Sequence, residues 1–182
     1  MKRIAIAYWL LPVEPACRFF QGLINELAFR YDAPVFEPHL TVHVGPNCTK
    51  SIGAILSKAA RDCGRIVLQP LEIGGSSEFI KTLFVRFAMD KQLKQLAQNI
   101  RAAARDCSDY QIDPHLSLLY RKTSSQDRCL LKRSIEIPFS QVTFDSLKAV
   151  RCVSPTQSRA DVEAWRVVAE QDLGESRTFF QP

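Results

Sequence analysis

Two of the three histidines in this chain of 182 residues stand in matching local sequences. Residues 38–42 read Pro-His-Leu-Thr-Val, and residues 114–118 read Pro-His-Leu-Ser-Leu. In each copy a carboxylate residue precedes the proline, and a hydroxyl residue follows the histidine by two positions. Because chance seldom places two of three histidines in one such frame, the repeat indicates an internal duplication.

The spacing within each copy brings an imidazole and a hydroxyl to one side of a strand. Residues two apart on a strand share a face and lie about 6.5–7 Å apart, so His39 accompanies Thr41 and His115 accompanies Ser117. With an ordinary pKa of about 6.5, a histidine can accept or donate a proton near neutral pH. Two such pairs across a groove would hold one phosphate between two proton-transfer groups, without a metal ion. The alternative, two buried histidines bonded to backbone, leaves the duplication unexplained.

His43 lies outside the repeated frame. A regular strand would place it on the face of His39 and Thr41, roughly 13 Å from His39. That separation is too long for a shared metal ion, which two histidines bind when they lie one helical turn apart. We therefore interpret His43 as a rim or packing residue, with a substrate contact as the alternative.

Two aromatic residues could contact a substrate. Tyr120 is odd-spaced from His115, so a regular strand would turn it to the opposite face, whereas a strand end or a bulge would bring it back. Trp9 leads out of the first predicted strand. Either ring could stack on a base, although packing in the core explains both residues equally well.

Hydrophobic periodicity predicts an alternation of strands and helices around these residues. Strands are expected at 3–10, 39–44, 66–73, 80–88, 115–120, 140–152 and 162–169, and helices at 16–30, 51–62, 90–105 and 124–133. The third helix has Asp90 as its cap, and residues 74–77 read as a turn. This pattern favours an α/β or α+β fold in a single domain over residues 1–182, with a loose tail over 174–182.

The composition, 46% hydrophobic and 24% charged, is typical of a soluble globular protein. No apolar run approaches the roughly 20 residues of a membrane span. The first residues resemble a signal peptide, but the alternation of Ile4, Ala5 and Ile6 and the early Pro12 favour a strand. Six scattered cysteines without a Cys-x-x-Cys pair favour free thiols in the cytoplasm, while their even number leaves disulfides open.

The net charge of +5 favours anionic ligands such as phosphates. It falls short of the dense Lys and Arg clusters of a dedicated nucleic-acid-binding protein. Charge therefore favours a small phosphorylated substrate over a long nucleic acid.

Four stretches resemble the two-histidine (2H) phosphoesterase superfamily, and within it the cyclic phosphodiesterases of plants and yeast. They are Tyr-Trp-Leu-Leu-Pro at 8–12, Phe-Glu-Pro-His-Leu-Thr-Val at 36–42, Pro-His-Leu-Ser-Leu-Leu-Tyr at 114–120 and Trp-Arg-Val-Val-Ala at 165–169. The resemblance implies an α+β fold of two lobes. Each lobe would have an antiparallel sheet with outer helices, and a pseudo-twofold axis would relate the lobes around a central cleft.

The resemblance also implies an activity and roles for the motif residues. Family members open ADP-ribose 1″,2″-cyclic phosphate and convert nucleoside 2′,3′-cyclic phosphates to 2′-phosphates. His39 and His115 would be the catalytic pair, Thr41 and Ser117 would hold the phosphate, and the remaining pocket residues would be Tyr120 and Trp9. We expect no metal and no cofactor, a small cyclic nucleotide as the partner, no membrane association, and a monomer.

Two departures from the family bear on these expectations. Residues 76–81 are less aromatic than the corresponding family strand, which puts recognition of a base in question. Ala169 and Glu170 stand where the plant form has a cysteine, so no disulfide to Cys63 is expected.

The division of roles between the two histidines stays open, and the proximity of Tyr120 in sequence favours His115 as the base. One rival function is RNA-end processing, by a 2′,3′-cyclic phosphodiesterase related to 2′-5′ ligases or by a 3′ exonuclease. The other is phosphate or RNA binding without catalysis.

Overall fold

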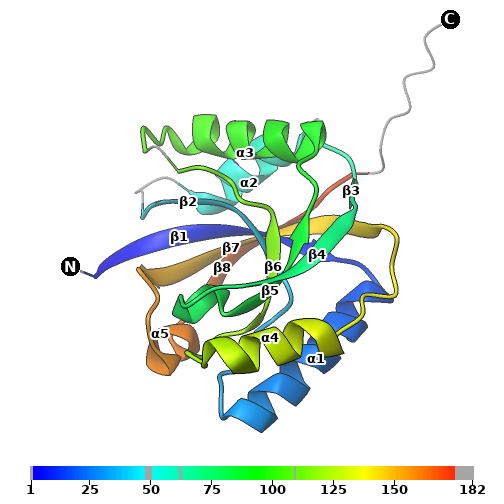
Figure 1. The fold of residues 1–182 in the computed structure, drawn as a ribbon. Helices are drawn as coiled ribbons and strands as arrows, with labels where there is room; N and C mark the ends of the chain where they lie inside the picture. The colour runs from blue at the N-terminus through cyan, green and yellow to red at the C-terminus, as the bar shows by residue number, and fades with distance from the viewer. Residues whose placement is uncertain (1, 48–50, 62, 109, 175–182) are drawn as a thin grey trace, which may run out of the picture.

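The computed structural model describes residues 2–47, 51–61, 63–108 and 110–174, and these form a sheet with helices outside it (Figure 1). The strands are β1 Arg3–Pro12, β2 Leu40–Pro46, β3 Ile66–Leu68, β4 Pro70–Gly75, β5 Leu83–Phe87, β6 His115–Leu119, β7 Val142–Ser154 and β8 Arg166–Asp172. The helices are α1 Ala16–Tyr31, α2 Ile52–Ala60, the 3₁₀ helix η1 Phe79–Lys81, α3 Lys91–Ala104, α4 Ser125–Ser134 and α5 Arg159–Glu163. The α+β class is thus confirmed.

The described strands belong to one antiparallel sheet, so the expectation of two separate sheets is wrong. The order is β3-β7-β1-β2-β6-β5-β4, with β8 also paired to β7. The pair that joins β2 to β6 is Leu40 with Leu116, the residues that directly follow the two motif histidines. Hydrogen bonding therefore continues through the place where a division between two sheets was expected.

The two long helices α1 and α3 each pack against the strand of the other motif. Helix α1 follows β1 in the chain but packs mainly against β6, and α3 follows β5 but packs against β2. Figure 1 shows α2 and α3 along one side of the sheet and α1 and α4 along the other. Buried residues of α1, such as Phe20, and of α3, such as Leu96, belong to one continuous apolar core. Because each helix packs against a strand of the other half, these contacts hold the two halves of the sheet together.

Side-chain caps mark the starts of α3, α4 and α5 among the described helices. The Asp90 side chain accepts hydrogen bonds from the backbone N–H groups of Gln92 and Leu93, which confirms it as the cap of α3. Several local predictions are wrong. The single strand expected at 66–73 is two strands, β3 and β4, at opposite ends of the sheet order, and η1 occupies the start of the strand expected at 80–88. Gly74 and Gly75 lie in strand β4 rather than in a turn, and α5 occupies the start of the segment expected to be the last strand.

Strand β2 has a bulge directly after its motif. Tyr8 of β1 pairs with His43 and Trp9 pairs with Thr41, so Val42 is an extra residue on β2. The alternation of faces is reset there, and His43 joins Tyr8 on the side covered by helices. The expectation that His43 shares a face with Thr41 is therefore wrong, because it assumed a regular strand.

Strand β6 has the same irregularity at the equivalent place. Leu83 of β5 pairs with Leu119 and Phe84 pairs with Ser117, so β6 also has an extra residue after its hydroxyl. Leu119 is buried in the main core, as His43 is on β2. The chain then brings Tyr120 back toward Ser117, as a bulge would require.

A hydrogen bond from His43 links β2 to the loop that leads into the second motif. Its Nε2 donates to Asp106 Oδ2 at 2.7 Å, and Asp106 also accepts from the backbone N–H of Ser108 at 2.9 Å and from its hydroxyl at 2.8 Å. Burial lowers the pKa of His43. Burial alone would raise the pKa of Asp106, but the bonds from Ser108 and His43 outweigh it and hold that pKa low. A neutral imidazole thus donates to an ionised carboxylate, and His43 is a packing residue.

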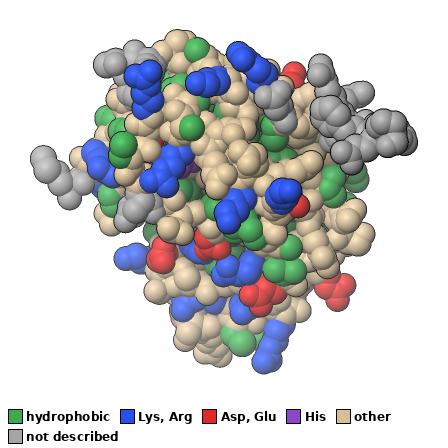
Figure 2. All heavy atoms as spheres, turned by 90° about the horizontal axis from the view of Figure 1, so that it is seen from above, with side chains coloured by type: hydrophobic (Ala, Val, Ile, Leu, Met, Phe, Trp, Pro, Cys, Tyr) green, Lys and Arg blue, Asp and Glu red, His purple; other side chains and the backbone are tan. Residues whose placement is uncertain are grey.

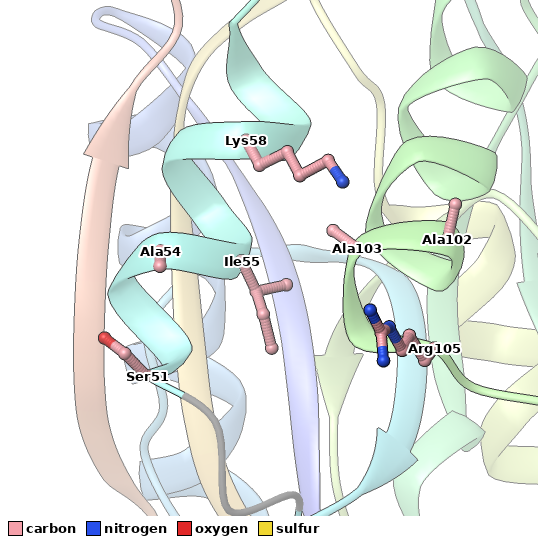
Figure 3. Close-up of a pocket in the computed structure, with 7 residues that line it drawn as sticks. All are labelled: Ser51, Ala54, Ile55, Lys58, Ala102, Ala103 and Arg105. Atoms are coloured by element: carbon pink, nitrogen blue, oxygen red, sulfur yellow. The ribbon is translucent and has the colours of Figure 1, made fainter.

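Helices α2 and α3 form an outer layer on the side remote from η1 and α4. Neither helix contains an acidic residue, and Figure 2, which views this side, shows several Lys and Arg side chains over it. A groove of about 350 Å³ runs between the two helices, with Lys58 and Arg105 extending into it (Figure 3). Part of the net positive charge is therefore concentrated on this outer layer.

The described cysteines, at positions 17, 63, 107, 129 and 152, are free thiols, and Cys48 lies outside the described residues. Gly174 forms an isolated bridge with Gly64, whereas the rest of the predicted loose tail, 175–182, lies outside the described residues. Over the described part of the chain, no helix is long and apolar enough to cross a membrane.

The contact between His43 and Asp106 generates a prediction about stability. The substitution His43→Ala leaves a buried carboxylate without its imidazole donor, which should lower the free energy of unfolding by about 2–4 kcal/mol. His43→Gln keeps an amide donor and should lose less. Turnover by the folded protein should stay near normal, because His43 faces away from the motif side. Denaturant unfolding and steady-state kinetics measure the two effects, and a stable but inactive His43→Ala variant would contradict this assignment.

Candidate active site

His39 lies immediately before β2 and is enclosed by aromatic rings. Its exposed fraction is 5%. The indole of Trp9 stacks on the imidazole, with ring centroids 3.7 Å apart and an interplanar angle of 13°. Trp165 and Phe36 approach edge-on, at 6.0 and 6.1 Å between centroids. The aromatic enclosure removes water from most of this imidazole.

His115 begins β6 and occupies the equivalent position in the second motif. Phe84 meets its imidazole edge-on, with centroids 5.3 Å apart. Trp9 and Phe84 correspond to each other, because each pairs across the sheet with the hydroxyl residue of its motif. The His115 side chain is 21% exposed, so the second imidazole is the more open of the two.

Both imidazoles are held in the same tautomer by the backbone. His39 Nδ1 lies 2.6 Å from the carbonyl oxygen of Glu37, and His115 Nδ1 lies 2.7 Å from that of Asp113. A carbonyl oxygen can only accept, so each Nδ1 carries the hydrogen and each Nε2 keeps its lone pair for proton transfer. This role of the backbone was not predicted from the sequence, although an acidic residue stands two positions before each histidine in both motifs.

The two acidic residues also form ion pairs through their side chains. Glu37 accepts from Lys148 Nζ at 2.7 and 3.0 Å. Asp113 accepts from Lys81 and, at 2.8 Å, from Arg86. Each carboxylate is thereby fixed by a basic residue of another segment, which holds the turn that presents the histidine.

The pairing of Leu40 with Leu116 brings the two motifs together. Because β2 and β6 are antiparallel, His39 lies toward Ser117 and Thr41 lies toward His115. The imidazoles are close enough for a positive charge on His115 to lower the pKa of His39. The structure thus gathers the four motif residues expected to act together.

Both imidazoles are poorer bases than an exposed histidine. Burial lowers the pKa of His39 to about 4, opposed by the hydrogen bond to Glu37 and assisted by charge on His115. Burial also lowers the pKa of His115, the bond to Asp113 opposes this, and the charge of Lys81 adds to the lowering. Both rings are therefore mainly neutral at pH 7, and a bound phosphate would favour protonation through its negative charge.

The two hydroxyls differ in their present partners. The Ser117 hydroxyl donates to the carbonyl oxygen of Ile80 at 2.9 Å, so it must rotate before it can donate to a phosphate. Thr41 is half-buried, and its side chain has no hydrogen bond to any other described residue. The proton of the Thr41 hydroxyl is thus the more readily available.

Tyr120 and Trp165 belong to the aromatic enclosure on the His39 side. Tyr120 stacks on Phe36 at 3.8 Å, meets Trp165 edge-on at 5.8 Å and is hydrogen-bonded to Ser117, and burial raises its pKa. These contacts give no support to the idea that Tyr120 positions water for His115. Trp165 was not predicted as a site residue, although residues 165–169 are among the stretches that resemble the family. Its Nε1 is buried without a hydrogen-bond partner among the described residues.

A small pocket lies beside the aromatic rings that enclose His39. Its volume is about 180 Å³, and Trp9, Phe36 and Trp165 line it together with Glu37 and several valines. Among the described residues, no group of three or more His, Cys, Asp or Glu side chains is arranged as metal ligands.

Comparison with known proteins identifies relatives along nearly the whole chain. The family model described as "Cyclic phosphodiesterase-like protein" matches residues 4–173. A cyclic phosphodiesterase of Arabidopsis thaliana is 20% identical over 177 residues, covering 95% of this chain and 97% of the relative. Among solved structures, apo LigT of E. coli is similar with a TM-score of 0.58 and 19% identity, covering 96% of this chain and 100% of LigT. LigT complexed with 3′-AMP gives 0.57 and 17%, with 95% and 99% covered.

The stacking of Trp9 on His39 generates a prediction about ionisation. Trp9→Ala opens the imidazole to water, so the pKa of His39 should rise from about 4 toward the ordinary value of about 6.5. NMR titration of the histidine ring signals measures this shift. Phe84→Ala is the matched control and should move the pKa of His115 while leaving that of His39 nearly unchanged. An unchanged His39 pKa in folded Trp9→Ala would show that the indole does not control its solvation.

Proposed function

The chain belongs to the cyclic phosphodiesterase-like protein family of the two-histidine phosphoesterase superfamily, and from this we propose that it hydrolyses small cyclic phosphates. The proposed substrates are ADP-ribose 1″,2″-cyclic phosphate and nucleoside 2′,3′-cyclic phosphates, the latter opened to 2′-phosphates. The name of the Arabidopsis relative, cyclic phosphodiesterase, supports this reaction class. The complex of LigT with 3′-AMP supports a nucleotide as the ligand.

The observation that carries the proposal is the repeated geometry of two neutral imidazoles. Each has its Nδ1–H bonded to a backbone carbonyl and its Nε2 lone pair free, and one pair of sheet residues, Leu40 and Leu116, brings them together. Hydrolysis of a cyclic phosphate requires one group to accept a proton and a second group to donate one. Two imidazoles fixed in this tautomer can supply both functions.

In the proposed reaction, a water oxygen attacks phosphorus as one neutral imidazole takes the water's proton on Nε2. The bond from phosphorus to one ribose oxygen breaks, and the other imidazole, protonated beforehand, gives its Nε2 proton to that oxygen. The two Nε2 atoms therefore share one proton in total, and the charge of the pair is the same before and after the step. Within the pair, either histidine can act as base in this scheme.

Thr41 and Ser117 are proposed to bind the non-bridging phosphate oxygens. Thr41 can donate without rearrangement, whereas Ser117 must release the carbonyl of Ile80. We propose further that the two halves of the sheet act as the two lobes of one cleft, related by an approximate twofold axis. The repeated bulges and the repeated Nδ1–carbonyl bonds support that relation.

A substrate panel tests the proposal. The purified protein should hydrolyse ADP-ribose 1″,2″-cyclic phosphate or nucleoside 2′,3′-cyclic phosphates in the presence of EDTA. His39→Ala and His115→Ala should each lower the rate by about 10²–10⁴-fold, because each removes a proton-transfer group. Thr41→Val and Ser117→Ala should each cost about 10–150-fold in kcat/KM, the effect of one charge-assisted hydrogen bond.

Three outcomes would contradict the proposal. Turnover of RNA with a cyclic-phosphate end but of no small substrate would favour an RNA-end enzyme. Binding without turnover would favour a phosphate-binding module. Loss of activity in EDTA that a divalent ion restores would replace the two-imidazole mechanism with a metal-assisted one. Circular dichroism of each variant controls for misfolding.

A further inference from the structure

The charged side chains around the two histidines are not equivalent. On the His39 side, Lys148 lies between two carboxylates, with Nζ 2.7 Å from Glu37 and 3.5 Å from Glu170. One cation there faces two anions. This group of ion pairs therefore has a net charge of −1 and does not favour a further anionic group.

On the His115 side, two cations face two carboxylates. Lys81 and Arg86 both bind Asp113, and Arg86 Nε also lies 3.5 Å from Glu72. This group has no net charge, so it is one unit more positive than the group beside His39. The difference gives the site an electrostatic direction, with its more positive end at the second motif.

Lys81 and Arg86 are held beside His115 by one aromatic ring. The Lys81 ammonium lies 5.1 Å and the Arg86 guanidinium 5.3 Å from the centroid of Phe84, whose ring lies 5.3 Å from that of His115. Burial is the main cause of the lowered pKa of His115, and the charges of Lys81 and Arg86 add to it while the Asp113 charge opposes them, so the field of both cations reaches the imidazole. Both cations are therefore close to where a substrate would react.

Lys81 and Arg86 have N–H donors that their ion pairs do not use, and both side chains are partly exposed to solvent. The side chain of Lys81 is 21% exposed and that of Arg86 is 37% exposed. An ammonium has three N–H donors and a guanidinium has five, and their bonds to Asp113 use only some of them. Further donors remain for an anionic ligand.

We propose that Lys81 and Arg86 form a subsite for a second phosphate of the substrate, beside the cyclic phosphate that reacts. The inference rests on the proposed function and narrows its substrate class to cyclic phosphates that bear another phosphoryl group. The excess of carboxylates beside His39 disfavours the opposite orientation. A 5′-phosphate and a pyrophosphate linkage would both give the subsite a phosphoryl group to bind. The test below includes one substrate of each kind to distinguish them.

Kinetics on matched substrates tests the subsite. Adenosine 2′,3′-cyclic phosphate is compared with its 5′-phosphorylated form and with ADP-ribose 1″,2″-cyclic phosphate, which has a pyrophosphate. The wild type should prefer a substrate with the second phosphate by about five- to thirtyfold in kcat/KM, through a lower KM. This is less than the effect of a buried charge-assisted bond, because Lys81 and Arg86 are partly exposed to solvent. Added salt should reduce the preference.

Variants distinguish the subsite from a merely structural role. Lys81→Gln and Arg86→Gln should each lose most of the preference, whereas Lys148→Gln, the matched ion-pair control beside His39, should keep it. If the two cations only fix Asp113, their removal should slow every substrate by the same factor. Equal losses, or a wild type without any preference, would overturn the subsite.

Binding of reaction products gives a readout that does not depend on turnover. Adenosine 2′,5′-bisphosphate should bind more tightly than adenosine 2′-phosphate, by about five- to thirtyfold in Kd, and Lys81→Gln should abolish the difference. Calorimetry measures both ligands. Equal affinities would refute the subsite even if hydrolysis is observed, whereas a preference without hydrolysis would refute the proposed activity and leave the subsite standing.

Discussion

The backbone pairing of Leu40 with Leu116 is the contact on which the site depends. It is the register pair that joins the two halves of the sheet, and it lies between the two histidines and the two hydroxyls. Both leucines are fully buried, so the apolar core holds this register on one face of the sheet. A slip of one residue would turn a whole motif to the other face. Packing of leucines on the helix side therefore determines which motif residues meet on the opposite side.

The two bulges explain how one strand can serve both the site and the core. After each hydroxyl, the extra residue resets the alternation, so His43 and Leu119 both turn toward the helices. The repetition of a bulge, a histidine bonded to the backbone and an aromatic neighbour in both halves indicates a common structural plan. The halves then diverge in their surroundings, with stacked aromatic rings beside His39 and paired cations beside His115. Such divergence gives chemically similar residues different solvation.

The sequence alone was sufficient to predict the repeated motif residues and the features that depend on neighbouring residues in the chain. The duplicated histidine frame and the Asp90 cap could be predicted because each depends on residues close together in the chain. The bulge beside His43 could not, since it is defined by the register between two strands. The single sheet depends on one long-range pair, and the contacts of Trp165 depend on a fold that brings the end of the chain to its beginning. The hydrogen bond from each histidine Nδ1 to the carbonyl two residues earlier could have been predicted, because an acidic residue and a proline precede the histidine in both motifs.

The central claim is that His39 and His115 act as one unit in a single step. The most direct measurement is kcat/KM of the double variant His39→Ala/His115→Ala against each single variant, on one cyclic phosphate substrate and with folding confirmed. Residues that share one step are strongly non-additive, so the double variant should be little slower than the slower single variant. If the two losses instead multiply, so that two losses of about 10³-fold give about 10⁶-fold, the histidines act independently and the account is wrong.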